Sequence, residues 1–263
     1  MKITIIGTGN IGSAFVEGLL REGSIASGDI TLTDISQEAL VPYMEKGLRT
    51  MQNNIEAVKN ADIIILCVKP YLVREVIEEI LPSLSRSTLL VSFAAGITLN
   101  QLTLYAGKRP MFRVIPNTAM AVCQSMTCVA ASYDTSIEQH STILNLFSRV
   151  GKAIMITESL MNAATVIASC GTAFALRYIR AATTAGVEIG FRPAVAETLI
   201  AQTMLGAAAL ISESGNHPEA EIDKVITPKG ITIKGLNEME HAGFTAAVTK
   251  GILAAYDVFG HVS

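Results

Sequence analysis

The sequence of 263 residues contains no tryptophan, only four histidines and only four cysteines. Metal-binding cysteines occur in closely spaced pairs, so the absence of any C-x-x-C spacing argues against a zinc site. Scattered cysteines are typical of proteins whose thiols stay reduced, and we therefore expect a cytoplasmic protein without structural disulfides. The four thiols belong to Cys67, Cys123, Cys128 and Cys170.

Charge is also scarce, since only 16% of the residues are charged and the net charge is −3. This balance gives no reason to expect nucleic acid or an anionic membrane as a partner. The apolar run at the N-terminus is short and lacks a cleavage region, so we expect no signal peptide. We also expect no membrane-spanning helix, because the apolar helical segments carry charges such as Arg177, Arg180 and Glu188.

The histidines give no sign of a catalytic or metal-binding cluster. An isolated histidine is more often a surface or capping residue than a general acid or base. We therefore expect neither a metal site nor a catalytic histidine among His140, His217, His241 and His261.

The first twelve residues form the most informative stretch of the chain. A β-branched apolar run, residues 1–6, leads into G-x-G-x-x-G at residues 7–12, and apolar residues follow at helical spacing. A strand, a glycine turn and a helix in this order form the context of a dinucleotide-binding motif. The first glycine permits the turn, the second admits a pyrophosphate, and the third lets helix and strand pack closely. The helix N-terminus should face the phosphates, so we assign Gly7, Gly9, Asn10, Ile11 and Gly12 to the cofactor site.

Asp34 ends the second expected strand, residues 30–34, about 20 residues beyond Gly12, where a ribose-binding acid is expected. A carboxylate there can accept hydrogen bonds from the ribose 2′-OH of NAD and would repel the 2′-phosphate of NADP. The alternative is that Asp34 caps the next helix, since Asp is a favoured N-cap residue. The spacing and the strand end favour the ribose role and hence a preference for NADH.

Strands and helices continue to alternate up to residue 157, which predicts an α/β fold with a doubly wound parallel sheet. The clearest buried strand is expected at residues 62–68, and two more at residues 88–93 and 111–115. The last, edge-side strands are expected at residues 127–131 and 153–156.

Three consecutive strands end in segments that should meet at one crevice, because ligands bind at the carboxyl ends of parallel strands. Small residues at a strand end leave room for a flat ring. Lys69 could equally be a solvated loop lysine, and its spacing does not decide between these roles. We add to the cofactor site Asn54, Val68, Lys69, Pro70, Ala94, Ala95, Gly96 and Asn117.

From Glu158 onward the strand pattern gives way to helices that are unusually apolar. Residues 207–210 and 252–255 have almost no polar face, and a helix that is apolar nearly all round must be buried. A domain of about 100 residues cannot easily enclose so much apolar surface. We therefore expect an intertwined helical dimer.

A polar loop interrupts these helices. Thr227, Lys229 and Thr232 lie together, and a helix is expected to begin just beyond them, at Ile233. Backbone N–H groups at a helix start, together with two hydroxyl groups, can bind a carboxylate. The alternative is that one of the threonines merely caps the helix, and spacing alone leaves both possibilities open.

Together these segments resemble the pyrroline-5-carboxylate reductases over nearly the whole chain. The resemblance rests on residues 6–12, 68–70, 92–98, 113–118 and 227–233, followed by Gly235-Leu236, Glu240, Gly243-Phe244 and Ala246-Ala247. It implies a Rossmann domain at residues 1–157, a helical dimerisation and substrate-binding domain at 158–263, and often larger assemblies of dimers. It also implies reduction of the C=N bond of 1-pyrroline-5-carboxylate to L-proline, the last step of proline biosynthesis, with NAD(P)H.

The resemblance further assigns roles within the polar loop. In the family the matching loop holds the substrate carboxylate, which assigns this role to Thr227, Lys229, Gly230, Ile231 and Thr232. The family threonine that matches Thr232 lies beside the ring nitrogen, which makes Thr232 the candidate catalytic residue. A cyclic imine protonates readily near neutral pH, so catalysis is mainly a matter of positioning.

Some residues depart from the family pattern. Residues 168–174 lack the family's proline, one glycine and a tyrosine hydroxyl, Ile231 replaces a small or hydroxyl residue, and Arg180 falls where an acid is common. Two alternatives follow. The chain could be a related Rossmann reductase for another cyclic imine or a β-hydroxy acid, or a dimer that binds the cofactor without turnover.

Overall fold

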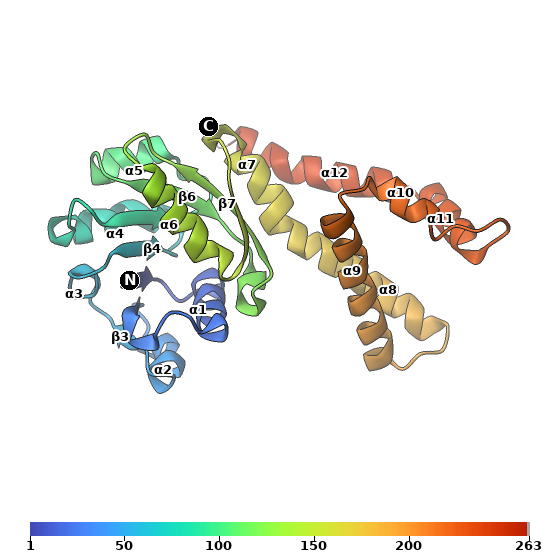
Figure 1. Ribbon diagram of the computed structural model, residues 1–263, viewed down its shortest axis with the longest axis horizontal. Coiled ribbons are helices and arrows are strands. Elements are labelled where there is room, and N and C mark those ends of the chain that lie inside the picture. The colour runs from blue at the N-terminus through green and yellow to red at the C-terminus, as the bar shows by residue number, and fades with distance from the viewer. Residues whose placement is uncertain (262–263) are drawn as a thin grey trace. The chain divides into compact units, whose positions relative to one another are not determined.

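The computed structural model describes residues 1–261 (Figure 1). The chain falls into two compact units. The first spans Met1–Thr172 together with residues 259–261, and the second spans Ala173–Val258.

The first unit is built on one eight-stranded sheet with the strand order β3-β2-β1-β4-β5-β6-β7-β8. Every neighbouring pair is parallel except β6 and β7, so the predicted doubly wound parallel sheet is confirmed up to β6. β7 turns back because residues 116–124 are too short for the crossover that parallel strands require. The strands are β1 (Ile3–Ile6), β2 (Ile30–Thr33), β3 (Arg49–Met51), β4 (Ile63–Leu66), β5 (Leu89–Ser92), β6 (Met111–Ile115), β7 (Ser125–Ala131) and β8 (Gly151–Met155).

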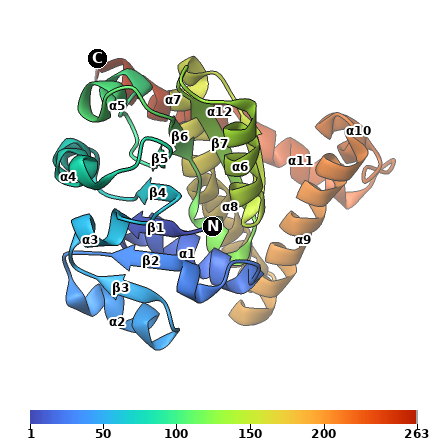
Figure 2. The ribbon, with the colours of Figure 1, turned by 60° about the vertical axis from the view of Figure 1, so that its left-hand side comes forward.

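Helices cover both faces of this sheet (Figures 1 and 2). Alternate residues of β1 point to opposite faces: Ile3 and Ile5 join one apolar cluster and Ile6 joins the other, as expected for a strand that is buried on both sides. The first cluster receives α1 (Asn10–Glu22), α2 (Gln37–Glu45) and α6 (Ile137–Ser148). The second receives α3 (Asn54–Val58), α4 (Val73–Ile80), α5 (Leu99–Ala106) and α7 (Met161–Ala164).

Capping residues explain where two of these helices begin. The Thr98 hydroxyl accepts a hydrogen bond from the backbone N–H of Gln101, whose side chain bonds back to the N–H of Thr98. Ser136 and Gln139 form the same reciprocal pair at the start of α6. Each arrangement satisfies two backbone donors that the first helical turn leaves free.

Short 3-10 turns complete the first unit. They are η1 (Ser27–Asp29), η2 (Pro70–Leu72), η3 (Leu81–Ser83), η4 (Thr118–Val122), η5 (Glu158–Leu160) and η7 (Val258–His261), and a π-helical turn, η6, spans Thr165–Cys170.

The segment 158–172 belongs to the sheet rather than to the helical unit. α7 and the π-turn contact β7, and the π-turn also contacts β6. Met161, Thr165 and Val166 are buried in this packing. The first unit therefore extends to Thr172, beyond the boundary at residue 157 that the loss of the strand pattern suggests.

The second unit consists of helices alone. Its helices are α8 (Gly171–Glu188), α9 (Pro193–Ser214), α10 (Pro218–Asp223), α11 (Ile231–His241) and α12 (Phe244–Asp257). Tyr178 of α8 and Phe244 of α12 meet edge to face, with ring centroids 6.3 Å apart. Among the described residues of these five helices only Ala196 is buried, so their apolar side chains lie largely at the surface of the isolated chain.

The expectation that no helix is long and apolar enough to cross a membrane is wrong. Within the described residues, Glu158–Glu188 and Pro193–Ser214 meet both conditions, with mean hydropathies of 1.4 and 1.6. The scattered charges on which the expectation was based are too few to lower the mean hydropathy of these helices. Length and composition alone do not distinguish a membrane span from a helix that a second protein surface covers.

Candidate active site

The glycine turn between β1 and α1 is sterically tied to β4. Gly7 has φ +101°, and a Cβ on it would lie 2.9 Å from the Cys67 carbonyl oxygen. A Cβ on Gly12 would lie 2.1 Å from the Gly7 carbonyl oxygen and 3.1 Å from the Cys67 Cβ. Any side chain at either position would push α1 away from the sheet.

Gly9 differs from both, because a Cβ there would meet nothing within 4 Å. It is the N-cap of α1, and no side chain caps the helix. The first N–H groups of α1, beginning with Asn10 and Ile11, are therefore left without intrahelical partners, next to the open space at Gly9. These features fit a pyrophosphate bound at the helix N-terminus.

Asp34 is bound to this turn. Its Oδ2 accepts hydrogen bonds from the backbone N–H and from the hydroxyl of Thr8, and its Oδ1 accepts one from the Ser36 N–H. Partial burial opposes ionisation of Asp34, but the bonds from Ser36 and Thr8 outweigh burial and lower its pKa. The carboxylate at the end of β2 is therefore charged at neutral pH.

The helix after Asp34 has a different cap. Ser36 is the N-cap of α2, and its hydroxyl accepts a hydrogen bond from the Ala39 N–H at 3.3 Å. The alternative in which Asp34 caps this helix is therefore wrong. Thr8 was not identified from the sequence, although its place between the two glycines of the turn is the signal that could have indicated it.

The remaining predicted cofactor residues differ in their exposure and in whether their side chains are already bound within the protein. Val68 and Ala94 are packed into the apolar cluster on the α4 side of the sheet. Asn54 accepts a hydrogen bond from the Thr33 hydroxyl at 2.7 Å and donates one to Glu79 at 2.9 Å. The exposed residues are Lys69, Pro70, Ala95 and Gly96.

Lys69 has no side-chain partner within the described part of the chain, so both of its possible roles stay open. Gly96 has φ +80°, and a Cβ added to it would meet no atom within 4 Å, which leaves room beside the strand end. These exposed positions are compatible with a flat ring lying against the edge of the sheet.

Asn117 lies at the carboxyl end of β6 and is 7% exposed. Its side-chain nitrogen donates to the Ala168 carbonyl at 2.8 Å, and its side-chain oxygen accepts from the Ala119 N–H at 3.0 Å. Its amide thus binds the protein backbone at both ends, and its predicted contact with the cofactor stays a prediction.

The polar loop of the second unit ends in a tight turn. The Gly230 N–H donates to the Thr227 carbonyl at 2.9 Å, and Lys229 between them has φ +61°, a left-handed conformation that is unfavourable for lysine. A Cβ on Gly230 would lie within 2.4 Å of the Thr227 hydroxyl oxygen. Gly230 is therefore required for the closure of this turn.

The helix α11 begins at Ile231, earlier than expected, so Thr232 lies in its first turn. Its N-cap is Gly230, and no side chain caps it, so the alternative in which Thr227 or Thr232 is the cap is wrong. The Thr232 hydroxyl has no hydrogen-bond partner in the described part of the chain. Ile231 beside it is 88% exposed. The loop therefore presents free backbone N–H groups, two hydroxyl groups and an ammonium group.

Other titratable groups have structural surroundings. Burial raises the pKa of the Cys67 thiol well above its ordinary value, so this thiol is not a nucleophile at neutral pH. His217 accepts a hydrogen bond from the Glu219 N–H and caps α10, and His140 is bonded to Thr135 at 2.7 Å. No cluster of three His, Cys, Asp or Glu residues that could hold a metal ion occurs in the described residues.

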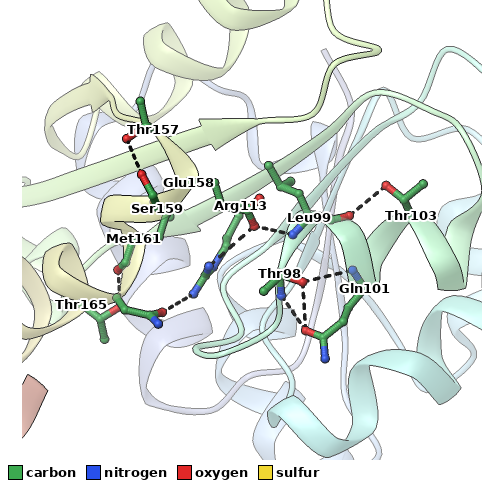
Figure 3. A network of polar contacts seen from close by, with 11 residues as sticks. Thr98, Leu99, Gln101, Thr103, Arg113, Thr157, Glu158, Ser159, Met161 and Thr165 are labelled. Carbon is green, nitrogen blue, oxygen red and sulfur yellow. Dashed lines mark hydrogen bonds and ion pairs between the residues drawn. The ribbon is translucent and has the colours of Figure 1, made fainter. Parts of the chain in front are cut away.

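A partly buried polar network around the buried Arg113 joins β6 to the segment 158–172 (Figure 3). Arg113 donates to the Asn162 side-chain oxygen at 2.9 Å and lies 3.7 Å from the Glu158 carboxylate. The same carboxylate oxygen accepts a hydrogen bond from the Leu99 N–H at the start of α5. Burial lowers the pKa of Arg113, and the nearby Glu158 opposes this.

Comparison with known proteins adds the family context. A family model described as pyrroline-5-carboxylate reductase dimerisation matches residues 158–261. A second model, described as NADP oxidoreductase, coenzyme F420-dependent, matches residues 2–96. The helical unit that exposes so many apolar side chains therefore lies within the dimerisation match.

Three curated relatives are pyrroline-5-carboxylate reductases. The chain is 37% identical to reductase 2 of Dictyostelium discoideum, across 96% of this chain and 90% of that protein. It is 35% identical to the enzyme of Methanosarcina acetivorans, across 97% of this chain and 95% of that protein. It is also 37% identical to reductase 1 of Dictyostelium discoideum, of which it spans about half, 48%.

Solved structures of similar proteins have the same fold. Pyrroline carboxylate reductase of Plasmodium falciparum, solved with NADP bound, superposes with a TM-score of 0.90 and 26% identity, covering 100% of this chain and 98% of that one. Pyrroline-5-carboxylate reductase of Coxiella burnetii superposes with a TM-score of 0.89 and 28% identity, with the same coverage.

Proposed function

The chain belongs to the pyrroline-5-carboxylate reductase family, as its motifs suggested, and we propose that its own residues carry out the family reaction as follows. It is an NAD(P)H-dependent oxidoreductase that reduces 1-pyrroline-5-carboxylate to L-proline. The observation that carries this function is identity of 35% or more to reductases matched along 90% or more of both chains.

The first unit binds the dinucleotide. When bound, the nicotinamide supplies the hydride for the reduction. The open space at Gly9 and the uncapped start of α1 suit the pyrophosphate, because free N–H groups and the positive end of the helix dipole meet there. Gly7 and Gly12 keep the turn close enough to β4 for these groups to converge.

Asp34 supports a preference for NADH. Its Oδ2 accepts two hydrogen bonds from Thr8, whereas its Oδ1 accepts one from the Ser36 N–H, and the backbone of Ile35 adds a further contact to the carboxylate. A carboxylate has about four acceptor sites, so a ribose hydroxyl can still donate to it. A charged carboxylate there would repel the 2′-phosphate of NADP. The relative from Plasmodium falciparum was solved with NADP, so this preference is proposed for this chain and not for the family.

The loop of the second unit binds the substrate carboxylate. The free N–H groups at the start of α11 donate to it, and the Lys229 ammonium adds a positive charge. Thr232 directly follows Ile231, the first residue of α11, so its hydroxyl can accept a hydrogen bond from the protonated ring nitrogen. Thr227 and Gly230 hold the turn closed.

The reaction needs little acid–base chemistry from the protein. The hydride forms a C–H bond at the imine carbon, and the C=N π electrons move to the nitrogen, which already carries its proton. The protein must hold the imine carbon about 3 to 3.5 Å from the hydride donor. A neutral threonine therefore suffices beside the nitrogen, and no histidine or cysteine is required.

We also propose that the protein is a homodimer or a larger assembly of dimers. The match to the dimerisation model supports a homo-oligomer, and the apolar side chains of α8, α9 and α12 supply the surface. Unpaired cysteines are compatible with the expected cytoplasmic location.

The test is an initial-rate assay with 1-pyrroline-5-carboxylate and either NADH or NADPH. We expect oxidation of the cofactor and formation of proline. Folded protein that binds the cofactor but oxidises none would overturn the proposed activity in favour of the non-catalytic alternative. The altered residues 168–174 raise the alternative of a related reductase with another substrate. A panel with other cyclic imines and a β-hydroxy acid tests it, because such a reductase would prefer one of these compounds to 1-pyrroline-5-carboxylate.

A further inference from the structure

The π-helical turn Thr165–Cys170 interrupts the long helix where it leaves the sheet. The Gly171 N–H reaches back five residues to the Val166 carbonyl, whereas an α-helix would reach back four. π-turns are rare and occur frequently at functional sites. The chain continues from this turn directly into α8 of the second unit.

Asn117 fastens this turn to the edge of the sheet where the cofactor site lies. Its side-chain nitrogen donates to the Ala168 carbonyl, in the middle of the turn. Its backbone N–H donates to the buried Ser125 hydroxyl, which contacts the Thr127 hydroxyl at 3.1 Å. Asn117 itself is therefore fixed by β7 and fixes the turn in its place.

Arg113 fastens the same segment at a second point. Its guanidinium group binds Asn162 in α7 and pairs with Glu158 just before it (Figure 3). Glu158 is held in addition by the Leu99 N–H. Two buried side chains, one within β6 and one at its carboxyl end, thus hold residues 158–168 against the sheet.

We propose that Asn117 is a positioning residue for the reduction: through the Ala168 carbonyl it sets the place of the π-turn beside the cofactor. This inference rests on the proposed imine reduction. In this role Asn117 acts through the turn, in place of the direct contact with the cofactor that the sequence predicts, because both ends of its amide are bound to the backbone. A displaced turn would disturb the carboxyl end of β6, where the cofactor site is expected, and small shifts in the alignment of reacting atoms slow hydride transfer strongly.

The test uses Asn117→Asp in the full-length protein, because Asp keeps the acceptor for Ala119 and loses the donor for Ala168. We expect kcat to fall by about tenfold to a hundredfold. We expect the Kd of the reduced cofactor to stay within about twofold, and the isotope effect with 4-deuterated cofactor to rise, because hydride transfer becomes slower. Amide hydrogens of residues 165–172 should exchange faster.

Asn145→Asp is the matched control, because Asn145 is exposed on α6 and its substitution should change none of these quantities. If Asn117→Asp does not yield soluble protein, Asn117→Ser replaces it, since serine can cap η4 but is too short to reach Ala168. An unchanged kcat, or a Kd that weakens in step with kcat/KM, would overturn the inference.

Failure of the proposed function has a different signature. In that case the unsubstituted protein does not reduce the imine, and hydrogen exchange alone tests the contact. Missing turnover then overturns the role in the reduction, and exchange at residues 165–172 in Asn117→Asp decides only whether Asn117 holds the turn: unaltered exchange contradicts this hold and faster exchange supports it.

Discussion

Thr8 donates two hydrogen bonds to one oxygen of Asp34, from its backbone N–H and from its hydroxyl, and each is 2.7 Å long. Thr8, the residue between the first two glycines of the motif, therefore holds the carboxylate that is proposed to bind the ribose. Bonds to an ionised acceptor are stronger than bonds between neutral groups, so this pair fixes the distance between the turn and the end of β2.

Substitution of Asp34 should change the cofactor preference. In Asp34→Ser we expect the ratio of kcat/KM for NADH to that for NADPH to fall by about tenfold. The fall is expected because NADH loses one charge-assisted hydrogen bond and NADPH is no longer repelled by the carboxylate. Asp29→Asn is a suitable control, because Asp29 lies before β2 and only its distant contact with the N-terminus is lost. An unchanged ratio in Asp34→Ser would contradict the ribose role.

The lowered pKa of Asp34 also makes a prediction about stability. A carboxyl group whose pKa is depressed in the folded state stabilises the fold above its unfolded pKa, about 4, and this contribution is lost as the pH falls through the folded pKa. At pH 7 the free energy of unfolding should therefore be larger for the unsubstituted protein than for Asp34→Asn. Denaturant titrations at a series of lower pH values should show this difference shrinking, and a constant difference would argue against the assignment.

The hydroxyl of Thr232 can be tested with isosteric residues. Thr232→Val removes the hydroxyl at nearly constant shape, and we expect kcat/KM for the imine to fall by about tenfold to a hundredfold, the range of one hydrogen bond to a charged group. Thr232→Ser keeps the hydroxyl and should retain most of the activity. Cofactor binding should be the same in both variants, and equal activity of the two would remove Thr232 from the mechanism.

Substitutions of Gly9 and Gly12 should distinguish an effect on stability from an effect on cofactor binding. In Gly9→Ala the new methyl group meets no protein atom, so we expect an unchanged Tm and weaker cofactor binding. In Gly12→Ala the methyl group would clash with the Gly7 carbonyl, so both Tm and binding should fall. Thermal unfolding and cofactor titration measure the two effects, and wild-type binding by Gly9→Ala would show that no phosphate approaches that position.

Strands with apolar β-branched runs, such as β1 and β4, could be predicted from the sequence because they are buried on both faces. β3 could not, because Arg49–Met51 lies at the sheet edge, is partly exposed and has no apolar run. The start of α11 was expected too late because Thr232 reads as a loop residue, whereas Gly230 serves as the N-cap without a side chain.

The residues of the cofactor turn could be predicted because they are adjacent in the sequence. The contacts that support the site could not. Asn117 and Ala168 are 51 positions apart, and Arg113 and Asn162 are 49 apart. A bond from a side chain to a distant carbonyl leaves no periodic pattern, and a single arginine in an apolar strand does not reveal its partner.

The place of Cys67 beneath the glycine turn has a practical consequence. Cys67 is buried in the apolar cluster that α1 joins, with its carbonyl group beside Gly7 and its Cβ beside Gly12, and burial keeps the thiol protonated. We expect a thiol-reactive reagent to modify it only when this cluster opens. The rate at which Cys67 is labelled, measured by mass spectrometry, therefore reports local opening of the dinucleotide-binding fold, and no cysteine has to be introduced for the measurement.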